Sequence, residues 1–107
     1  RIITKKRVKT IHIGTKDIYE WTMYEGKSIL MPLLFESSKK LINKNEDEIR
    51  AVRIEADIRG AQTAFDFWVR KDDIDDTLSK LMEWALEEEK YEICQEIKKL
   101  EDKLQTF

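Results

Sequence analysis

The sequence is poor in the residues that build disulfides, metal sites and many active sites. Its 107 residues include a single cysteine, Cys94, and a single histidine, His12. A lone cysteine cannot form an internal disulfide, and this usage is typical of a reducing cytoplasm. One histidine and one cysteine cannot assemble a typical zinc site, and no local motif pairs them for nucleophilic catalysis. We therefore expect a cytoplasmic protein that is not an enzyme and has neither a metal nor a cofactor.

Glycine, proline and long apolar segments are also scarce. Three glycines and one proline leave no Gly/Pro-rich linker that would divide the chain. The longest apolar run covers residues 29–35, which is far too short to span a bilayer, so we expect no membrane partner. We therefore expect one domain of common size, with an α+β core over residues 1–74 and an amphipathic helical segment over residues 75–107.

Charge is abundant, balanced overall and unevenly placed. Lys and Arg number 20 and Asp and Glu number 22, so the net charge is −2. Residues 1–70 carry 14 basic and 10 acidic residues, a net of +4, and residues 71–107 carry 6 and 12, a net of −6. A basic front and an acidic tail indicate attraction within the fold or between copies, or two surfaces for different partners.

The first half of the chain predicts a hairpin followed by a helix. Residues 7–13 and 18–23 are rich in β-branched and aromatic side chains, and residues 14–17 separate them, so we interpret them as two paired strands. Proline is favoured in the first turn of a helix. Pro32 therefore predicts a helix that begins near residues 28–31 and runs to about Ile42.

A second hairpin is predicted in residue-by-residue register. Apolar and charged residues alternate over residues 52–58, and Arg59 and Gly60 supply a turn. This turn places Ile54 opposite Phe65 and Arg53 opposite Asp66, and it also brings Val52 opposite Phe67. Apolar pairs then share one face and an opposite-charge pair lies on the other, which is the pairing that stabilises antiparallel strands.

The C-terminal third has a helical period. Apolar residues recur at three- and four-residue spacing from residue 78 to residue 104. Aspartates at positions 72, 73, 75 and 76 precede this segment, and we expect them to cap the free N–H groups of its first turn. The element order is then ββαββα, which predicts an α+β fold in which helices cover one face of an antiparallel four-stranded sheet.

Periodicity leaves open whether the last segment is one helix or two. About 30 unbroken helical residues would extend about 45 Å, longer than so small a domain, so a continuous helix would have to bury its far half against a second copy. A break near residues 89–91 would instead fold the segment back. Glycine and proline are absent after residue 60, which favours the continuous helix.

Residues 78–104, LSKLMEWALEEEKYEICQEIKKLEDKL, resemble the UVR motif. This motif is a short helical hairpin found at the ends of the excision-repair proteins UvrB and UvrC. The family's pattern of a small residue, acids, an aromatic followed by an acid, a small residue and a basic residue after an aliphatic falls here on Ala85, Glu87, Glu88, Tyr91, Glu92, Cys94, Ile97 and Lys98. The resemblance implies association with another protein, not catalysis.

Three functions remain open. The first is a protein-interaction module that acts as an adaptor, regulator or inhibitor of a larger partner and forms homo-oligomers, with binding residues Trp84, Glu87, Glu88, Tyr91, Glu92 and Lys98. The second is a nucleic-acid-binding regulator whose basic N-terminal residues contact phosphates, namely Arg1, Lys5, Lys6, Arg7 and Lys9. The third is a small-molecule-binding protein with a pocket between sheet and helix, lined by Tyr19, Trp21 and Trp68.

Overall fold

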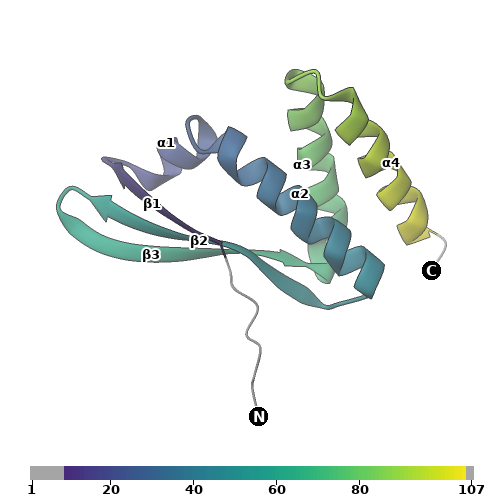
Figure 1. The fold of residues 1–107 in the computed structure, drawn as a ribbon, viewed down its shortest axis with the longest axis horizontal. Helices are drawn as coiled ribbons and strands as arrows, with labels where there is room; N and C mark the ends of the chain where they lie inside the picture. The colour runs from purple at the N-terminus through teal and green to yellow at the C-terminus, as the bar shows by residue number, and fades with distance from the viewer. Residues whose placement is uncertain (1–8, 106–107) are drawn as a thin grey trace, which may run out of the picture.

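A computed structural model of the chain describes residues 9–105. The elements follow in the order β1 (Lys9–Thr15), α1 (Ile18–Met23), α2 (Lys27–Lys44), β2 (Glu48–Ile58), β3 (Ala61–Arg70), a 3-10 turn (Lys71–Asp73), α3 (Ile74–Glu87) and α4 (Tyr91–Gln105). The strands form one sheet in the order β1-β2-β3, in which β1 is parallel to β2 and β3 is antiparallel to β2. The helices lie on one side of this sheet, and the described residues leave its other face uncovered (Figure 1).

The predicted four-stranded antiparallel sheet is wrong, although the α+β class holds. The segment expected to be the second strand is helix α1. Its N-cap is Asp17, whose carboxylate accepts hydrogen bonds from the backbone N–H groups of Tyr19 at 2.9 Å and Glu20 at 3.3 Å. These two bonds satisfy donors that a helix N-terminus leaves free. The chain then returns through α1 and α2, and such a crossover makes β1 and β2 parallel.

The predicted second hairpin is confirmed in its register. Ile54 lies opposite Phe65 and Arg53 lies opposite Asp66, and the Val52 and Phe67 pair is also formed. Arg59 and Gly60 have φ angles of 53° and 85°, which are the two positive values of a type I′ turn. A β-bulge between positions 50 and 52 changes the register by one residue, so that Arg50 lies opposite Trp68.

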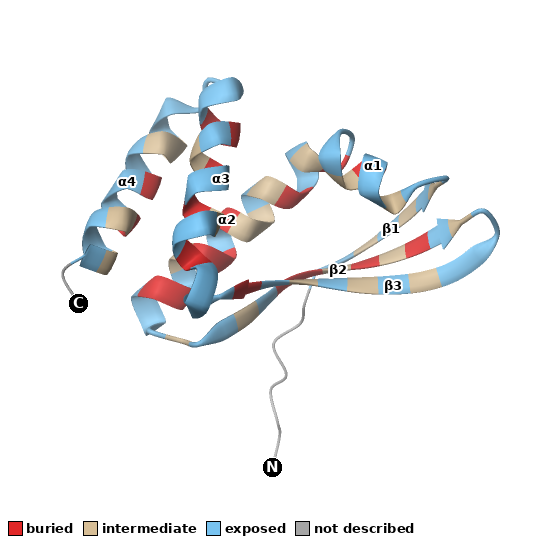
Figure 2. Ribbon diagram, turned by 180° about the vertical axis from the view of Figure 1, so that it is seen from behind, coloured by how far each residue is buried: buried red, intermediate tan, exposed pale blue. Residues whose placement is uncertain are grey.

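One hydrophobic core joins the sheet to the helices. Val52, Ile54 and Ala56 of β2 are fully buried, and Figure 2 shows the buried bands of β2 and of the inner sides of the helices. Leu81 of α3 and Ile97 of α4 are likewise fully buried and belong to the same cluster. The C-terminal helices are therefore part of the core and not an appendage.

The C-terminal segment is two helices packed as a hairpin, so the preference for one continuous helix is wrong and the alternative break is observed (Figure 1). Lys39 of α2 forms an ion pair with Glu96 of α4 at 3.3 Å, which ties the hairpin to the rest of the fold. The expected capping by aspartate side chains is not observed, because Asp73 at the N-cap of α3 makes no side-chain hydrogen bond to the helix. None of the described helices combines the length and apolarity that a membrane span requires.

Candidate functional site

The turn between α3 and α4 has a defined backbone structure. Glu89 lies in the left-handed region with a φ of 55°. The N–H of Lys90 donates to the carbonyl of Ala85 at 2.8 Å, and the N–H of Glu89 donates to the carbonyl of Leu86 at 3.1 Å. These are the two hydrogen bonds of a Schellman motif, which satisfy the last carbonyls of a helix. The turn is therefore held by its own hydrogen bonds, although it contains no glycine.

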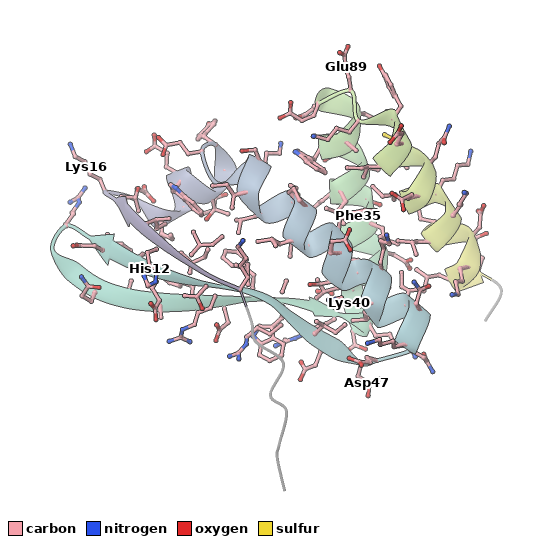
Figure 3. The ribbon with its side chains drawn as sticks, viewed as in Figure 1. His12, Lys16, Phe35, Lys40, Asp47 and Glu89 are labelled. Atoms are coloured by element: carbon pink, nitrogen blue, oxygen red, sulfur yellow. The ribbon has the colours of Figure 1, made fainter. Side chains whose placement is uncertain are left out.

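Residues 86–92, which we call the helical tip, combine exposed apolar and acidic side chains. Leu86 is 53% exposed and Tyr91 is 59% exposed. Figure 3 shows Glu89 at the outer end of the hairpin, directed away from the body of the protein. A hollow of about 510 Å³ is lined by Glu89, Lys90, Tyr91, Glu92 and Ile93. The tip carries four carboxylates and one ammonium group, a net charge of −3.

Trp84 supports the tip from within. Its side chain is only 2% exposed, and the ammonium of Lys90 lies 5.7 Å from the centroid of its ring. The indole N–H is enclosed and has no hydrogen-bond partner among the described residues. Trp84 therefore packs beneath the turn. The sequence pattern predicts it as a binding residue, but its buried side chain is not exposed to a partner.

The structure brings most of the predicted binding residues together at the tip. Glu87, Glu88 and Glu92 are exposed there beside Tyr91. Glu87 also forms an ion pair with Lys27 at 3.2 Å, which connects the end of α3 to the start of α2. Lys98 is exposed on α4 but lies seven residues beyond Tyr91, about 10 Å along the helix.

The sequence interpretation missed three residues of the tip. Leu86, Glu89 and Lys90 were not among the predicted binding residues, yet all three are exposed at the turn. One signal was present in the sequence, because Leu86 follows Ala85 and falls outside the apolar stripe of α3. A leucine outside the stripe of an amphipathic helix points away from the core.

The uncovered face of the sheet carries ion pairs between β2 and β3 and a histidine–carboxylate contact between β1 and β2. Asp66 lies 3.6 Å from Arg50 and 3.5 Å from Arg53. Arg53 also lies 3.5 Å from Glu55, and Glu55 lies 3.2 Å from the Nδ1 atom of His12. Both arginines therefore face carboxylates of their own chain, and among residues 9–105 this face offers no uninterrupted positive surface to phosphates.

The predicted nucleic-acid contacts are not assembled by the described residues. Arg1, Lys5, Lys6 and Arg7 lie outside these residues. Lys9 is exposed at the start of β1, and strand alternation directs it to the side of the sheet opposite His12. Nucleic-acid binding stays a prediction, because only Lys9 of the five predicted contact residues lies among the described residues.

The residues predicted for a small-molecule pocket lie apart. Trp21 lines a hollow of about 290 Å³ beside α1. Trp68 lines a different hollow, of about 180 Å³, beside Leu34 and Leu81. The guanidinium carbons of Arg50 and Arg70 lie 5.9 and 5.8 Å from the centroid of the Trp68 ring. Tyr19 is 73% exposed and lines neither hollow, so neither of these two hollows contains all three aromatic residues.

Comparisons with known proteins do not assign the chain to a family. No family model, no curated protein and no solved structure matches it. Between residues 9 and 105 there is no group of three or more His, Cys, Asp and Glu side chains placed to hold a metal ion. The helical tip is therefore a candidate docking site by its geometry alone.

Proposed function

We propose that this protein is a small interaction module that docks on a larger protein through the helical tip and acts as its adaptor, regulator or inhibitor. The observation that carries the proposal is the exposure of Leu86 and Tyr91 on a turn with a fixed backbone. Aromatic side chains are enriched among the residues that dominate binding energy. A turn that is already ordered loses little conformational entropy on binding, so more of the contact energy appears as affinity.

The charge of the tip defines the chemistry of the partner. A net charge of −3 around two apolar side chains fits an apolar pocket surrounded by Lys and Arg. Charges at the rim of an interface act mainly on the association rate and on its salt dependence. The resemblance of residues 78–104 to the UVR motif, which implies association through a helical hairpin, supports the same interpretation.

Self-association belongs to the same proposal. Further large apolar side chains are exposed on α1, in the turn after it and at the start of α2, namely Tyr19, Met23, Tyr24 and Ile29. Large contiguous patches of exposed apolar side chains mark interaction surfaces in proteins. A second copy of the chain is a partner that is always present, and sedimentation velocity over a range of concentrations measures it directly.

The test compares two aromatic positions of similar exposure. Tyr91→Lys changes the tip, and Tyr19→Lys makes the same chemical change on α1, where the side chain is 73% exposed. Each variant of the full chain is immobilised, and proteins bound from a lysate of the source organism are quantified. Copies of the protein itself are left out of the count, because Tyr19 belongs to the surface proposed for self-association. Loss of an aromatic anchor costs about 2 kcal/mol or more, about thirtyfold in affinity. Capture should therefore fall with Tyr91→Lys and persist with Tyr19→Lys; equal capture by both would show that the tip is not the docking surface.

A further inference from the structure

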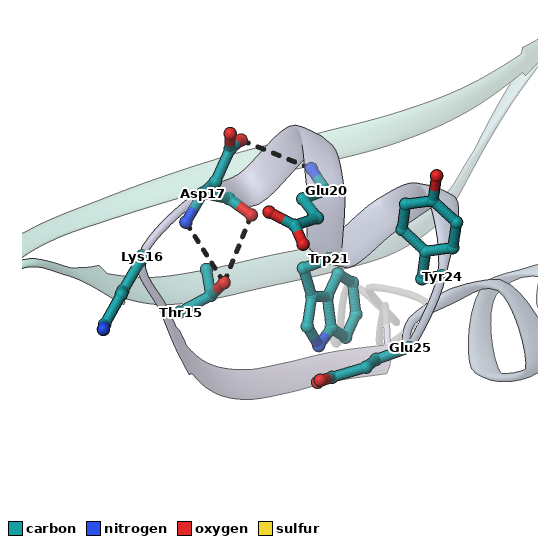
Figure 4. A pocket seen from close by; sticks show the side chains of 7 residues that line it. All are labelled: Thr15, Lys16, Asp17, Glu20, Trp21, Tyr24 and Glu25. Carbon is teal, nitrogen blue, oxygen red and sulfur yellow. Dashed lines mark hydrogen bonds between the residues drawn. The ribbon is translucent and has the colours of Figure 1, made fainter.

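A hollow beside α1 lies far from the helical tip in the chain and has its own chemistry. It is bounded on one side by the turn that enters α1 and on the other by the turn that leaves it, with Trp21 between them (Figure 4). Its volume is about 290 Å³. This is the lower end of the range of small-molecule pockets, about 300–1,000 Å³, so it suits a small molecule or one residue of a peptide.

The floor of the hollow presents an unused hydrogen-bond donor. Trp21 is only 6% exposed, and its indole N–H has no hydrogen-bond partner among the described residues; unlike the N–H of Trp84 it is not enclosed by protein, so a ligand can reach it. The six-membered ring packs on Gly26, where an added Cβ would lie 2.6 and 2.7 Å from Cε3 and Cη2 and closer still to Cζ3. The N–H belongs to the opposite edge of the indole, so it is directed away from Gly26 and into the hollow that Trp21 lines.

The rim of the hollow is acidic. Glu20 and Glu25 are exposed and form no ion pair among the described residues. Asp17 uses Oδ1 to cap α1, which leaves its other carboxylate oxygen available. Lys16 is the one basic residue in the lining, so the rim carries a net charge of −2. Hydrogen bonds between Thr15 and Asp17, at 3.1 and 3.3 Å, fix the turn that holds these groups.

Two requirements on a ligand follow from these groups. The indole N–H needs an acceptor oxygen, which a bare metal ion cannot supply. The carboxylates need a cation, and the ring of Tyr24 at the rim adds a surface that attracts one. We infer that the hollow binds an α-ammonium group together with the adjacent carbonyl oxygen. This pair of groups occurs in the free N-terminus of a peptide and in small amino amides.

The indole signal of Trp21 reports on this site directly. The chain has three tryptophans, so its ¹⁵N–¹H spectrum contains three side-chain N–H signals, which are assigned before titration. The probes are L-alaninamide, N-acetyl-L-alaninamide, which lacks the cation, and n-propylammonium, which lacks the carbonyl. Each is added to the full chain up to about 50 mM, because small ligands with few contacts bind in the millimolar range.

L-Alaninamide should shift the Trp21 signal saturably and leave the signals of Trp68 and Trp84 in place. n-Propylammonium should bind more weakly, and the acetylated compound should give no saturable shift. Tetra-alanine with a free N-terminus distinguishes the two sources of the ligand. Tighter binding than L-alaninamide identifies a peptide N-terminus, and equal or weaker binding identifies a small amino amide.

Matched charge variants complete the test. Glu20→Gln with Glu25→Gln should weaken L-alaninamide binding by between about twofold and about thirtyfold, since each exposed carboxylate contributes about 0.2–1 kcal/mol. Glu36→Gln makes the same change at an exposed position of α2 outside the hollow and should leave binding unchanged. All of these side chains are exposed, so folding is preserved. An unmoved Trp21 signal, equal binding of the acetylated probe, or wild-type binding by the double variant would overturn the inference.

Discussion

Replacing Glu89 by glycine should stabilise the protein. Glu89 is the residue in the left-handed region at the end of α3, with a φ of 55°. Most side chains are strained there, whereas glycine is not. Its neighbour Glu88 provides a matched control, because it is also an exposed glutamate but has a φ of −89° and a ψ of 4°. Both substitutions remove one negative charge beside the end of the same helix.

The magnitude follows from two opposing terms. Removing the strain of a side chain in the left-handed region stabilises the folded state by about 1–2 kcal/mol. Glycine has more conformational freedom in the unfolded chain, which destabilises the folded state by about 0.5–1 kcal/mol. Glu89→Gly should therefore raise the free energy of unfolding by about 0.5–1 kcal/mol, which is about 2–8 °C in Tm. Glu88→Gly has only the second term and should lower the free energy of unfolding by about 0.5–1 kcal/mol.

Urea unfolding followed by circular dichroism, with thermal melts as a second measurement, checks both variants. The decisive quantity is the sign of the difference between two adjacent positions, which is independent of the charge that both variants lose. In a continuous helix each substitution would cost about 1 kcal/mol. Destabilisation of the same size by Glu89→Gly and Glu88→Gly would therefore refute the break between α3 and α4.

Three further substitutions test other parts of the fold by urea unfolding. Arg59→Asn should raise stability by up to about 1 kcal/mol, because Asn-Gly is the preferred pair for the type I′ turn; no gain would contradict the turn assignment. Gly26→Ala should cost about 1–3 kcal/mol, since the added Cβ would overlap the ring of Trp21; a neutral effect would show that the ring is not packed there. Leu81→Ala should cost about 2–5 kcal/mol, because Leu81 is fully buried between the sheet and helices, and a loss under 1 kcal/mol would exclude that position from the core.

The second hairpin was predictable because three local signals agree. The alternation of residues 52–58, the turn at Arg59 and Gly60 and the charge pair of Arg53 with Asp66 each specify the same register. A shift by one residue would move Ile54 to the exposed face and Arg53 to the core. Such a register is strongly determined wherever one face of a sheet is buried.

The helical structure of residues 18–23 was not predictable from residue type alone. Ile18 and Trp21 have the spacing of a helical stripe, but the β-branched and aromatic content of the segment equally suits a strand. The deciding interaction is the cap by Asp17, which is a single side chain outside the segment. Once α1 replaces a strand, β1 can pair with β2 only after a crossover, so one local misassignment changes the topology of the whole sheet.

The sequence interpretation offered the break after α3 only as an alternative to a continuous helix, for a related reason. Glycine is the usual residue at the left-handed position of a Schellman motif, and a sequence without glycine gives no sign of it. Here Glu89 occupies that position, and Asn45 with a φ of 53° occupies the corresponding position after α2. The sequence named candidate residues at the tip and a possible break near residues 89–91, but it gave no signal that decided between the break and a continuous helix.

The glutamate at position 89 lowers the stability of the fold and also contributes charge to the proposed docking surface. Glycine would fit the backbone better there, so the side chain costs stability that the fold alone does not require. Its carboxylate is one of the four that give the tip its charge and lies at the outer end of the hairpin (Figure 3). If a basic partner docks on this tip, Glu89→Gly should associate more slowly at low salt while being more stable. Stopped-flow association at two ionic strengths separates the two effects, because the stability gain persists at high salt and the difference in association rate disappears as the charges are screened. An unchanged association rate at low salt would show that the strain at Glu89 serves no electrostatic role in docking.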